Sequence, residues 1–305
     1  MKSIQYEALV EIVEEYLKIC KIEGKSDATL TNYRNSMRRY LKFVRESKDV
    51  ASRLQILNYL SSMDSLKPGS RNKFFRETKS FFNWAVSSGR MSSNPFDGLK
   101  NVRIPEQVRI PFSPDDVNRL LEATSGCTDR EIRDKAVILM FVDTGVRLGE
   151  LVGVEYQDID FTSRRILIKK AKGGSGRIVP FADRCCDALV KYIEVRSPSL
   201  GPLFWKATPY GRLISQSPIT AIGIRQAMAR VGDLAQVSDV YPHRFRHTFA
   251  TWAIKNNARE IDVQHILGHR SLDMIRRYTM TYRSEQAAGR HSEFSPGDQM
   301  LETRN

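Results

Sequence analysis

The sequence predicts a mainly α-helical protein with one small antiparallel β-sheet, divided into two domains. Apolar residues recur at helical spacing over most of the chain, as they do in amphipathic helices. Segments of strand character are confined to residues 154–181. A chain of 305 residues is also too long for one ordinary compact core, so two domains of unequal size are expected.

The first ninety residues are predicted to form four helices. Apolar residues at i, i+3, i+4 and i+7 begin at Tyr6, and the same spacing recurs within 33–44, 54–60 and 74–85. Gly89 is expected to end the last of these helices, because glycine readily adopts the left-handed conformation that follows many helices.

The domain boundaries follow from composition. The stretch 92–114 contains four prolines and no helical period, which is typical of a linker. The sequence therefore predicts a helical domain over 1–104, a linker over 105–112, a second domain over 113–283 and a C-terminal tail over 284–305.

The second domain is expected to open with a capped helix. Ser113 can cap it, Pro114 suits its first turn, and Asp116 stands at the spacing of a capping box. A buried helix is predicted at 134–144 and is expected to end at Gly145.

The rest of this domain combines helix and strand. A short helix from Leu148 is followed by strand character in VEYQDIDF, RRILIKK and RIVPF, the last two joined by AKGGSG. Helical patterns return from Ser217 onward, in SPITAIGIRQAMARVG, HRFRHTFATWAIKN, REIDVQHILG and SLDMIRRYT. The domain is therefore predicted to be mostly α with a single β insertion, which ends in a flexible hairpin.

Charge points to a polyanionic partner. The chain has a net charge of +13 and a pI near 9.6, and both predicted domains carry more Lys and Arg than Asp and Glu. Phosphates bound by such residues release condensed counterions, which favours a nucleic acid as the partner. Alternatively, the surplus charge only keeps the protein soluble, and the first domain is then a plain helical bundle.

The sequence also indicates where in the cell the protein is located. The longest apolar run, around 136–142, is far too short to span a bilayer, and the N-terminus lacks the cleavage site of an export signal. A cytoplasmic location without membrane attachment is expected. The four cysteines show no CxxC spacing and are predicted to be reduced and structural: Cys20, Cys127, Cys185 and Cys186.

The segment HRFRH at 243–247 gathers four groups that can each be cationic. On one helix, Phe245 would face the core, while His243 and Arg246 would share a neighbouring face. Their N–H groups suit the oxygens of a phosphate or carboxylate, and the planar guanidinium fork binds two such oxygens at once. The alternative is structural: Arg246 pairs with a buried acid and His243 caps the helix.

Three further motifs accompany HRFRH in the second domain: TGVRLGEL, KKAKGGSGRIVPF and LGHRSL, the last followed by Tyr278. In this combination the sequence resembles the tyrosine recombinase and integrase family, and in size and layout it is most like the compact Xer-type enzymes. The resemblance extends over both predicted domains. It implies a helical, SAM-like core-binding domain and an α+β catalytic domain of the tyrosine recombinase type.

The resemblance also implies a catalytic set and an orienting acidic residue, Glu150. The catalytic positions are Arg147, Lys172, His243, Arg246, His269 and Tyr278. In the implied chemistry the arginines neutralise the phosphate oxygens, Tyr278 attacks phosphorus to give a 3′-phosphotyrosyl intermediate, and Lys172 protonates the departing 5′ oxygen. No metal or other cofactor is expected.

Two of these assignments have competitors close by in the sequence. Arg147 can form an ordinary ion pair with Glu150, three residues on. Lys172 can be one more solvated lysine beside Lys169 and Lys170, and its choice depends on the resemblance alone.

The assignments of Tyr278 and His269 have alternatives as well. Tyr282 is a rival nucleophile, although the spacing from LGH favours Tyr278. His265 and His269 are four residues apart and can bind a metal on one helical face, but the zinc-protease pattern would require Glu where Ile266 stands.

The resulting functional hypothesis is a site-specific DNA recombinase. Its implied partner is double-stranded DNA with specific recombination sites, bound by a tetramer in which the tail contacts a neighbouring subunit. A partner recombinase or an accessory protein remains open. Alternatives are a type IB topoisomerase-like enzyme and a catalytically silent DNA-binding architectural protein, the latter disfavoured because none of the six catalytic positions is replaced.

Overall fold

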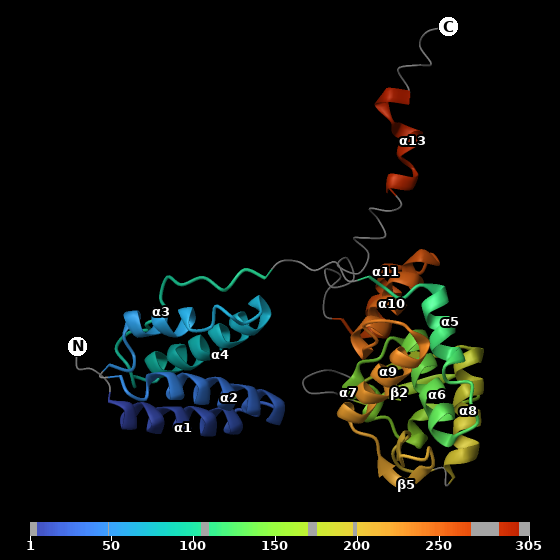
Figure 1. Ribbon diagram of the computed structural model, residues 1–305, viewed down its shortest axis with the longest axis horizontal. Coiled ribbons are helices and arrows are strands. Elements are labelled where there is room, and N and C mark those ends of the chain that lie inside the picture. Colours follow the sequence, from blue (N-terminus) through green and yellow to red (C-terminus); the bar gives the residue numbers. More distant parts are fainter. Residues whose placement is uncertain are drawn as a thin grey trace. The chain divides into compact units, whose positions relative to one another are not determined.

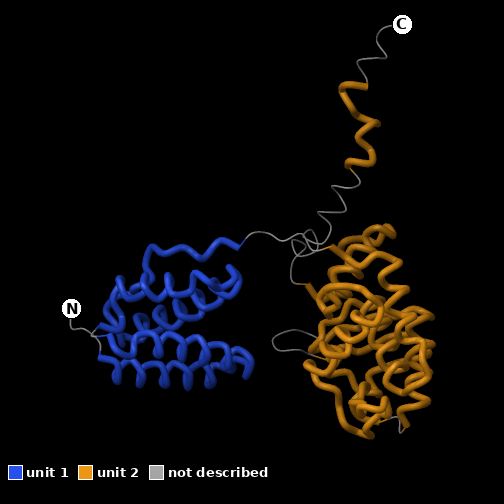
Figure 2. Tube along the Cα trace, viewed as in Figure 1, with its two compact units in different colours: residues 1–107 blue, residues 108–305 orange. Residues whose placement is uncertain are grey.

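The computed structural model describes residues 5–47, 49–104, 110–169, 176–197, 200–269 and 287–298. The chain divides into two compact units, residues 1–107 (unit 1) and 108–305 (unit 2) (Figure 2). Within the described ranges, no helix combines the length and apolar character needed to cross a membrane.

Unit 1 contains the four helices that the apolar spacing predicts (Figure 1). They are α1 (Tyr6–Ile22), α2 (Asp27–Val44), α3 (Arg53–Ser61) and α4 (Pro68–Ser87). The hydroxyls of Ser26 and Ser52 accept backbone N–H groups at the starts of α2 and α3. Gly89 has a φ of 72°, which confirms its place in the turn after α4.

Aromatic side chains fill the core of unit 1. Tyr40 is fully buried, lies edge-on to Tyr59 and Phe82 at centroid distances of 4.9 and 5.6 Å, and donates its hydroxyl to the carbonyl of Val50 over 2.6 Å. The core therefore joins α2, α3 and α4 and the turn between α2 and α3.

Unit 2 is mostly helical. Its helices are α5 (Pro114–Glu122), α6 (Asp129–Thr144), α7 (Leu148–Val152), η1 (Tyr156–Asp158, a 3₁₀ turn), α8 (Asp183–Arg196), α9 (Ala221–Ala235), α10 (Pro242–Lys255), α11 (Glu260–Leu267) and α13 (His291–Phe294). The capping box predicted at the start of α5 is present, with Ser113 and Asp116 each accepting the other's backbone N–H over 3.0 Å.

Helix α6 crosses the core of unit 2 and starts earlier than the apolar pattern indicates. A second capping box, between Thr128 and Glu131, begins the helix at Asp129. The first residues of the helix are too polar to show the apolar spacing by which a helix is recognised. Its end at Gly145, with a φ of 59°, is as predicted. Phe141 of α6 stacks on Phe245 of α10 at 5.7 Å, which places α10 against α6.

The predicted sheet is present and is antiparallel, in the order β1–β2–β3. Its strands are β1 (Ile159–Asp160), β2 (Arg165–Ile168) and β3 (Arg177–Pro180), and Ile166 pairs with Val179. The expectation of a single β insertion is wrong. A second antiparallel pair, β4 (Trp205–Ala207) and β5 (Leu213–Pro218), follows α8.

Candidate active site

The motif TGVRLGEL folds around the start of α7. Arg147 is the N-cap residue, with extended backbone, and its N–H donates to Oε2 of Glu150 over 2.8 Å. Its Nη1 donates to Oε1 of Glu150 over 2.9 Å. The ion pair considered as a competitor is therefore present. It leaves Arg147 half-exposed, with 45% of its side chain accessible, whereas Glu150 is buried.

Arg246 is buried against two helix ends. It lies on α10 and donates from Nη1 to the carbonyl of Gly145, at the end of α6, over 2.7 Å. Its Nη2 donates to the carbonyl of Leu267, at the end of α11, over 2.6 Å. Carbonyls at helix C-termini lack intrahelical partners and carry partial negative charge, so they stabilise a buried cation.

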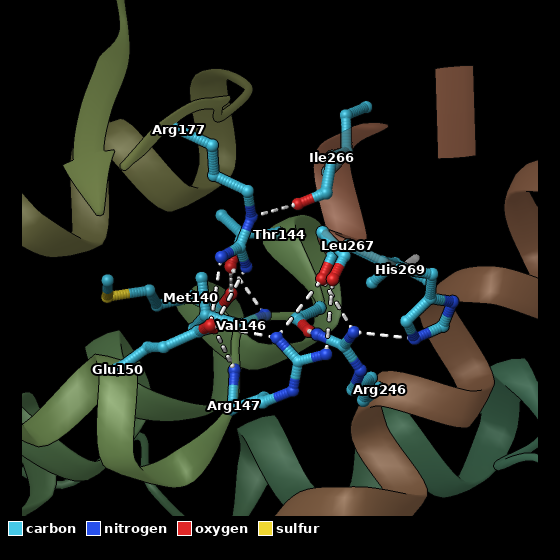
Figure 3. A network of polar contacts seen from close by, with 12 residues as sticks. Met140, Thr144, Val146, Arg147, Glu150, Arg177, Arg246, Ile266, Leu267 and His269 are labelled. Carbon is cyan, nitrogen blue, oxygen red and sulfur yellow. Dashed lines mark hydrogen bonds and ion pairs between the residues drawn. The ribbon is translucent and has the colours of Figure 1, made fainter. Parts of the chain in front are cut away.

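Arg147 contacts the same end of α11. Its Nη1 donates to the carbonyl of Leu267 over 3.4 Å and its Nη2 to the carbonyl of Gly268 over 3.3 Å. Figure 3 shows the guanidinium groups of Arg147 and Arg246 side by side at this carbonyl. The structure thus brings together two arginines that the sequence separates widely.

His269 completes this group. It follows Gly268, whose φ of 63° ends α11 and turns the chain towards α10. Its Nε2 lies 2.7 Å from Nη2 of Arg246 (Figure 3). A guanidinium can only donate, so Nε2 must accept, and the tautomer assigned from this contact carries its proton on Nδ1.

Burial and the nearby charges keep His269 neutral. Burial, with the guanidinium groups of Arg246 and Arg147 as the largest charge contributions, lowers the pKa of His269 to about 4. His243 also contributes to this lowered pKa, so the exposed first turn of α10 lies within electrostatic reach of the site. The alternative in which His243 caps α10 is wrong, because Tyr241 is the N-cap residue.

The other arginine and the other histidine of HRFRH have different surroundings. Arg244 donates from Nε to the carbonyl of Ile110 over 3.0 Å, and its guanidinium lies 4.0 Å from the ring centre of Phe112. His247 is buried. Arg244 therefore attaches the segment that leads into α5 to the helix that carries Arg246.

A third arginine, Arg177 on β3, belongs to the network and was not predicted from the sequence. Its Nη1 and Nη2 donate to the two oxygens of Glu150 over 2.8 Å each, and its Nε donates to the carbonyl of Ile266 over 2.6 Å. One signal was available: Arg177 is two residues from Val179 and so shares its inward face of the strand.

Glu150 is held ionised by these donors. Burial would raise the pKa of this carboxyl, but hydrogen bonds from Arg177 and Arg147 outweigh it and lower the pKa to about 2. Three guanidinium groups therefore face one carboxylate and a neutral imidazole. This part of the site has an excess of positive charge, which suits an anion with several oxygens, such as a phosphate.

Four residues of the functional hypothesis lie outside the described residues: Lys172 and its neighbour Lys170, and the two candidate nucleophiles Tyr278 and Tyr282. Their roles stay predictions.

Lys169, the remaining neighbour of Lys172, is described. Its Nζ lies 2.5 Å from Oε2 of Glu155 and 2.9 Å from Oδ1 of Asp158, and hydrogen bonds to these carboxylates raise its pKa. An ammonium paired in this way is a poor proton donor, so Lys169 is a weak alternative to Lys172.

The metal-binding alternative does not fit the end of α11. His265 lies on the helix, but the helix ends at Leu267, so His269 does not continue the same helical face. In the described ranges, no three His, Cys, Asp or Glu side chains are grouped so that they could hold a metal ion. The four cysteines are free, and Cys20 and Cys185 are buried.

The amino-acid sequence of this chain is similar to those of known proteins. Residues 112–285, more than half of the chain, match the phage integrase family. The tyrosine recombinase XerC of Staphylococcus saprophyticus is 28% identical over 279 residues, which cover 88% of this chain and 92% of the relative. The XerC of Thermodesulfovibrio yellowstonii is 29% identical over 280 residues, covering 88% and 90%.

Solved structures show the same fold. A lambda integrase dimer bound to a COC′ core site aligns with a TM-score of 0.72 at 18% identity, covering 88% of this chain and 94% of that one. XerH site-specific recombinase bound to a palindromic difH substrate, in a post-cleavage complex, aligns with a TM-score of 0.70 at 18% identity, covering 94% and 89%.

Proposed function

This chain belongs to the phage integrase family, and we propose that its cluster of arginines holds the scissile phosphate of a DNA strand during site-specific recombination. The protein is a tyrosine recombinase, an enzyme that cleaves and rejoins DNA. Arg147 and Arg246 bind the two non-bridging oxygens, which removes the negative charge that otherwise repels an incoming nucleophile.

The observation that carries this proposal is the shared contact of Arg147 and Arg246 with the carbonyl of Leu267. Two guanidinium groups fixed to one backbone atom are already in place before the substrate binds, so little reorganisation is needed during the reaction. A phosphodiester gains a second negative charge when an ionised phenol attacks it. The excess positive charge of the cluster stabilises that charge as it develops.

The reaction exchanges one phosphoester for another. The phenolate oxygen of Tyr278 bonds to phosphorus, the bond from phosphorus to the 5′ oxygen breaks, and Lys172 gives its proton to that oxygen. A 5′-hydroxyl of a second strand then returns its proton to Lys172, attacks the 3′-phosphotyrosine, reforms a phosphodiester and releases Tyr278 as the phenolate. No bond energy is lost, so no nucleotide triphosphate is consumed.

The two histidines act beside the arginines. Neutral His269 accepts a hydrogen bond from Arg246 through Nε2 and so fixes the orientation of that guanidinium. His243 lies in the exposed first turn of α10 and is assigned as a further hydrogen-bond donor to the phosphate in the transition state.

Partners and location follow from the same proposal. Unit 1 is assigned as the core-binding domain, and its basic residues contact phosphates of the duplex DNA. A tetramer on two recombination sites, with the tail at 284–305 contacting a neighbouring subunit, is proposed, and a partner recombinase or accessory protein can join it. The enzyme acts on DNA in the cytoplasm.

A nicked suicide duplex tests this function. The recombination site is first recovered by sequencing the genomic fragments that become covalently attached to the wild-type protein. The nicked duplex that carries this site should then trap a covalent protein–DNA adduct, and Tyr278→Phe should abolish the adduct while DNA binding is kept. An adduct that persists in Tyr278→Phe contradicts the assignment of the nucleophile, and Tyr282→Phe is the next variant to examine.

A further inference from the structure

Arg177 lies where three elements of unit 2 meet. Its side chain comes from β3, binds Glu150 on α7 through both Nη atoms, and binds the carbonyl of Ile266 on α11 through Nε (Figure 3). Only 16% of this side chain is exposed. Arg177 therefore connects the strand to two elements that carry residues of the candidate site.

The carboxylate of Glu150 is saturated by this arrangement. Oε1 accepts from Nη1 of Arg147 and Nη1 of Arg177, and Oε2 accepts from the backbone N–H of Arg147 and Nη2 of Arg177. A carboxylate offers about four lone-pair sites, and all are used. Because both arginines share this one group, a shift of Glu150 also displaces Arg147.

Arg177 also packs against the turn that leads to His269. A Cβ atom placed on Gly268 would lie 3.2 Å from Cδ, Cζ and Nε of Arg177, so the backbone of the turn rests closely on the guanidinium. Gly268 supplies the positive φ that ends α11, and His269 follows it directly. The position of Arg177 thus sets the position of this turn.

We propose that Arg177 is a positioning residue for DNA cleavage: through Glu150 and the end of α11 it holds Arg147 and His269 at the scissile phosphate. This inference rests on the proposed function. Arg177 does not bind the phosphate itself, because the fork of its guanidinium faces Glu150. A lysine cannot replace it fully, since one ammonium cannot reach both carboxylate oxygens and the carbonyl of Ile266 in this geometry.

A purely structural ion pair would have different consequences. Its loss would weaken the fold of unit 2 and reduce DNA binding and cleavage together. Loss of a positioning residue reduces the cleavage rate while DNA binding persists, because the arginines still carry their charge but no longer meet the phosphate in the reactive geometry. Small displacements of this kind cost about 100-fold in rate.

The test compares Arg177→Gln with Arg177→Lys and with Arg165→Gln as the matched control. Arg165 lies on the neighbouring strand β2, is exposed and stands opposite Pro180, so its removal takes the same charge from the same hairpin. The single-turnover rate of adduct formation and the DNA affinity are measured on the nicked duplex. We expect Arg177→Gln to be slower by about 100-fold, Arg177→Lys to be intermediate, and the affinity of Arg177→Gln to equal that of Arg165→Gln.

A double-mutant cycle with Glu150→Gln shows whether Arg177 acts through Glu150. The two losses of rate should be strongly non-additive, because each variant breaks the same contact. Additive losses, a wild-type rate in Arg177→Gln, or a loss of affinity as large as the loss of rate would each overturn the inference. If Arg177→Gln does not fold, Arg177→Lys takes its place in the cycle.

Amide hydrogen exchange provides a readout that does not depend on activity. Arg177→Gln should accelerate exchange at 148–151 and 266–269, the two segments that Arg177 holds, whereas Arg165→Gln should not. Unchanged exchange there overturns the inference. A wild-type protein that forms no adduct on any genomic fragment contradicts the proposed function instead, and the exchange measurement then shows only whether Arg177 holds these two segments.

Discussion

Arg147 and Arg246 donate hydrogen bonds to one and the same backbone atom, the carbonyl oxygen of Leu267, over 3.4 and 2.6 Å. The end of α11 is therefore the common anchor of two arginines that come from the start of α7 and the second turn of α10. Because the anchor is backbone, the geometry of the site depends on how the ends of α6 and α11 pack together.

Gly145 is the most sensitive point of that packing. A Cβ atom there would lie 2.6 Å from side-chain atoms of both Leu267 and Phe249, at a φ of 59°. Gly145→Ala should therefore combine overpacking, about 1–3 kcal/mol, with left-handed strain of about 1–2 kcal/mol. Urea unfolding of unit 2 measures the loss.

Gly201 provides the control for this substitution. It has a φ of 70° in the same unit, and a Cβ atom placed on it would meet no atom within 4 Å outside its chain neighbours. Gly201→Ala should cost only the strain, about 1–2 kcal/mol, and should not change DNA cleavage. Equal losses of stability in the two variants would contradict the account of the packing at Leu267.

His269 should stay neutral far below its ordinary pKa. Burial and the neighbouring guanidinium groups lower the pKa from 6.5 to about 4, so the unfolded chain takes up a proton on this residue at a pH where the folded chain does not. The contribution of His269 to stability is thus lost progressively as the pH falls from 6.5 towards 4.

An NMR titration of the His269 ring protons measures this directly. A midpoint near 4 is expected in the wild type, and a higher midpoint in Arg246→Gln, because the largest of the charges that lower the pKa is removed. A wild-type midpoint near 6.5 would show that the imidazole does not lie in this environment.

Sequence alone predicts most of this fold, because its signals are local. The apolar spacing of the first domain, the capping box at Ser113 and the turn at Gly145 depend on neighbouring residues, and the structure contains each of them. The candidate site residues follow from a family pattern and not from local signals, and the structure brings four of them together: Arg147, Glu150, Arg246 and His269.

The features that were not predicted have weak sequence patterns or depend on contacts between residues that are distant in the sequence. Helix α8 was missed although Cys185, Leu189 and Tyr192 recur at helical spacing on its buried face, and the fourth buried position is the charged Arg196, which ends this apolar stripe. Strand β5 is largely exposed and polar, so it lacks the alternation that marks a strand. Arg177 was missed because its partners, Glu150 and Ile266, are distant in the sequence.

Substitutions of Lys172 and Lys169 should have different effects on DNA cleavage. Lys172→Met should slow cleavage by about 100-fold or more, because the departing 5′ oxygen loses its proton donor. Lys169→Met should have little effect, since its ammonium is already bound by Glu155 and Asp158. Single-turnover cleavage of the nicked duplex distinguishes the two.

A substrate with sulfur in place of the 5′ oxygen makes the lysine test specific. A thiolate leaves without a proton, so this substrate should restore the rate of Lys172→Met. A variant that stays slow on the sulfur substrate would show that Lys172 is not the proton donor, and a slow Lys169→Met that is rescued would transfer the role to Lys169.

DNA affinity should fall steeply with salt. The net charge of +13 and the basic excess in both parts of the chain predict many phosphate contacts, each of which releases counterions. The logarithm of the binding constant, measured by fluorescence anisotropy, should decrease linearly with the logarithm of salt concentration. A binding constant that does not change with salt concentration would mean that the basic residues do not contact DNA.

The most direct test of the central claim is a crystal structure of the protein trapped on its nicked recombination site. The phosphorus should be bonded to the phenol oxygen of Tyr278, with the guanidinium groups of Arg147 and Arg246 about 2.7–2.9 Å from its non-bridging oxygens. A phosphate bonded to another residue, or out of reach of either arginine, would contradict the account.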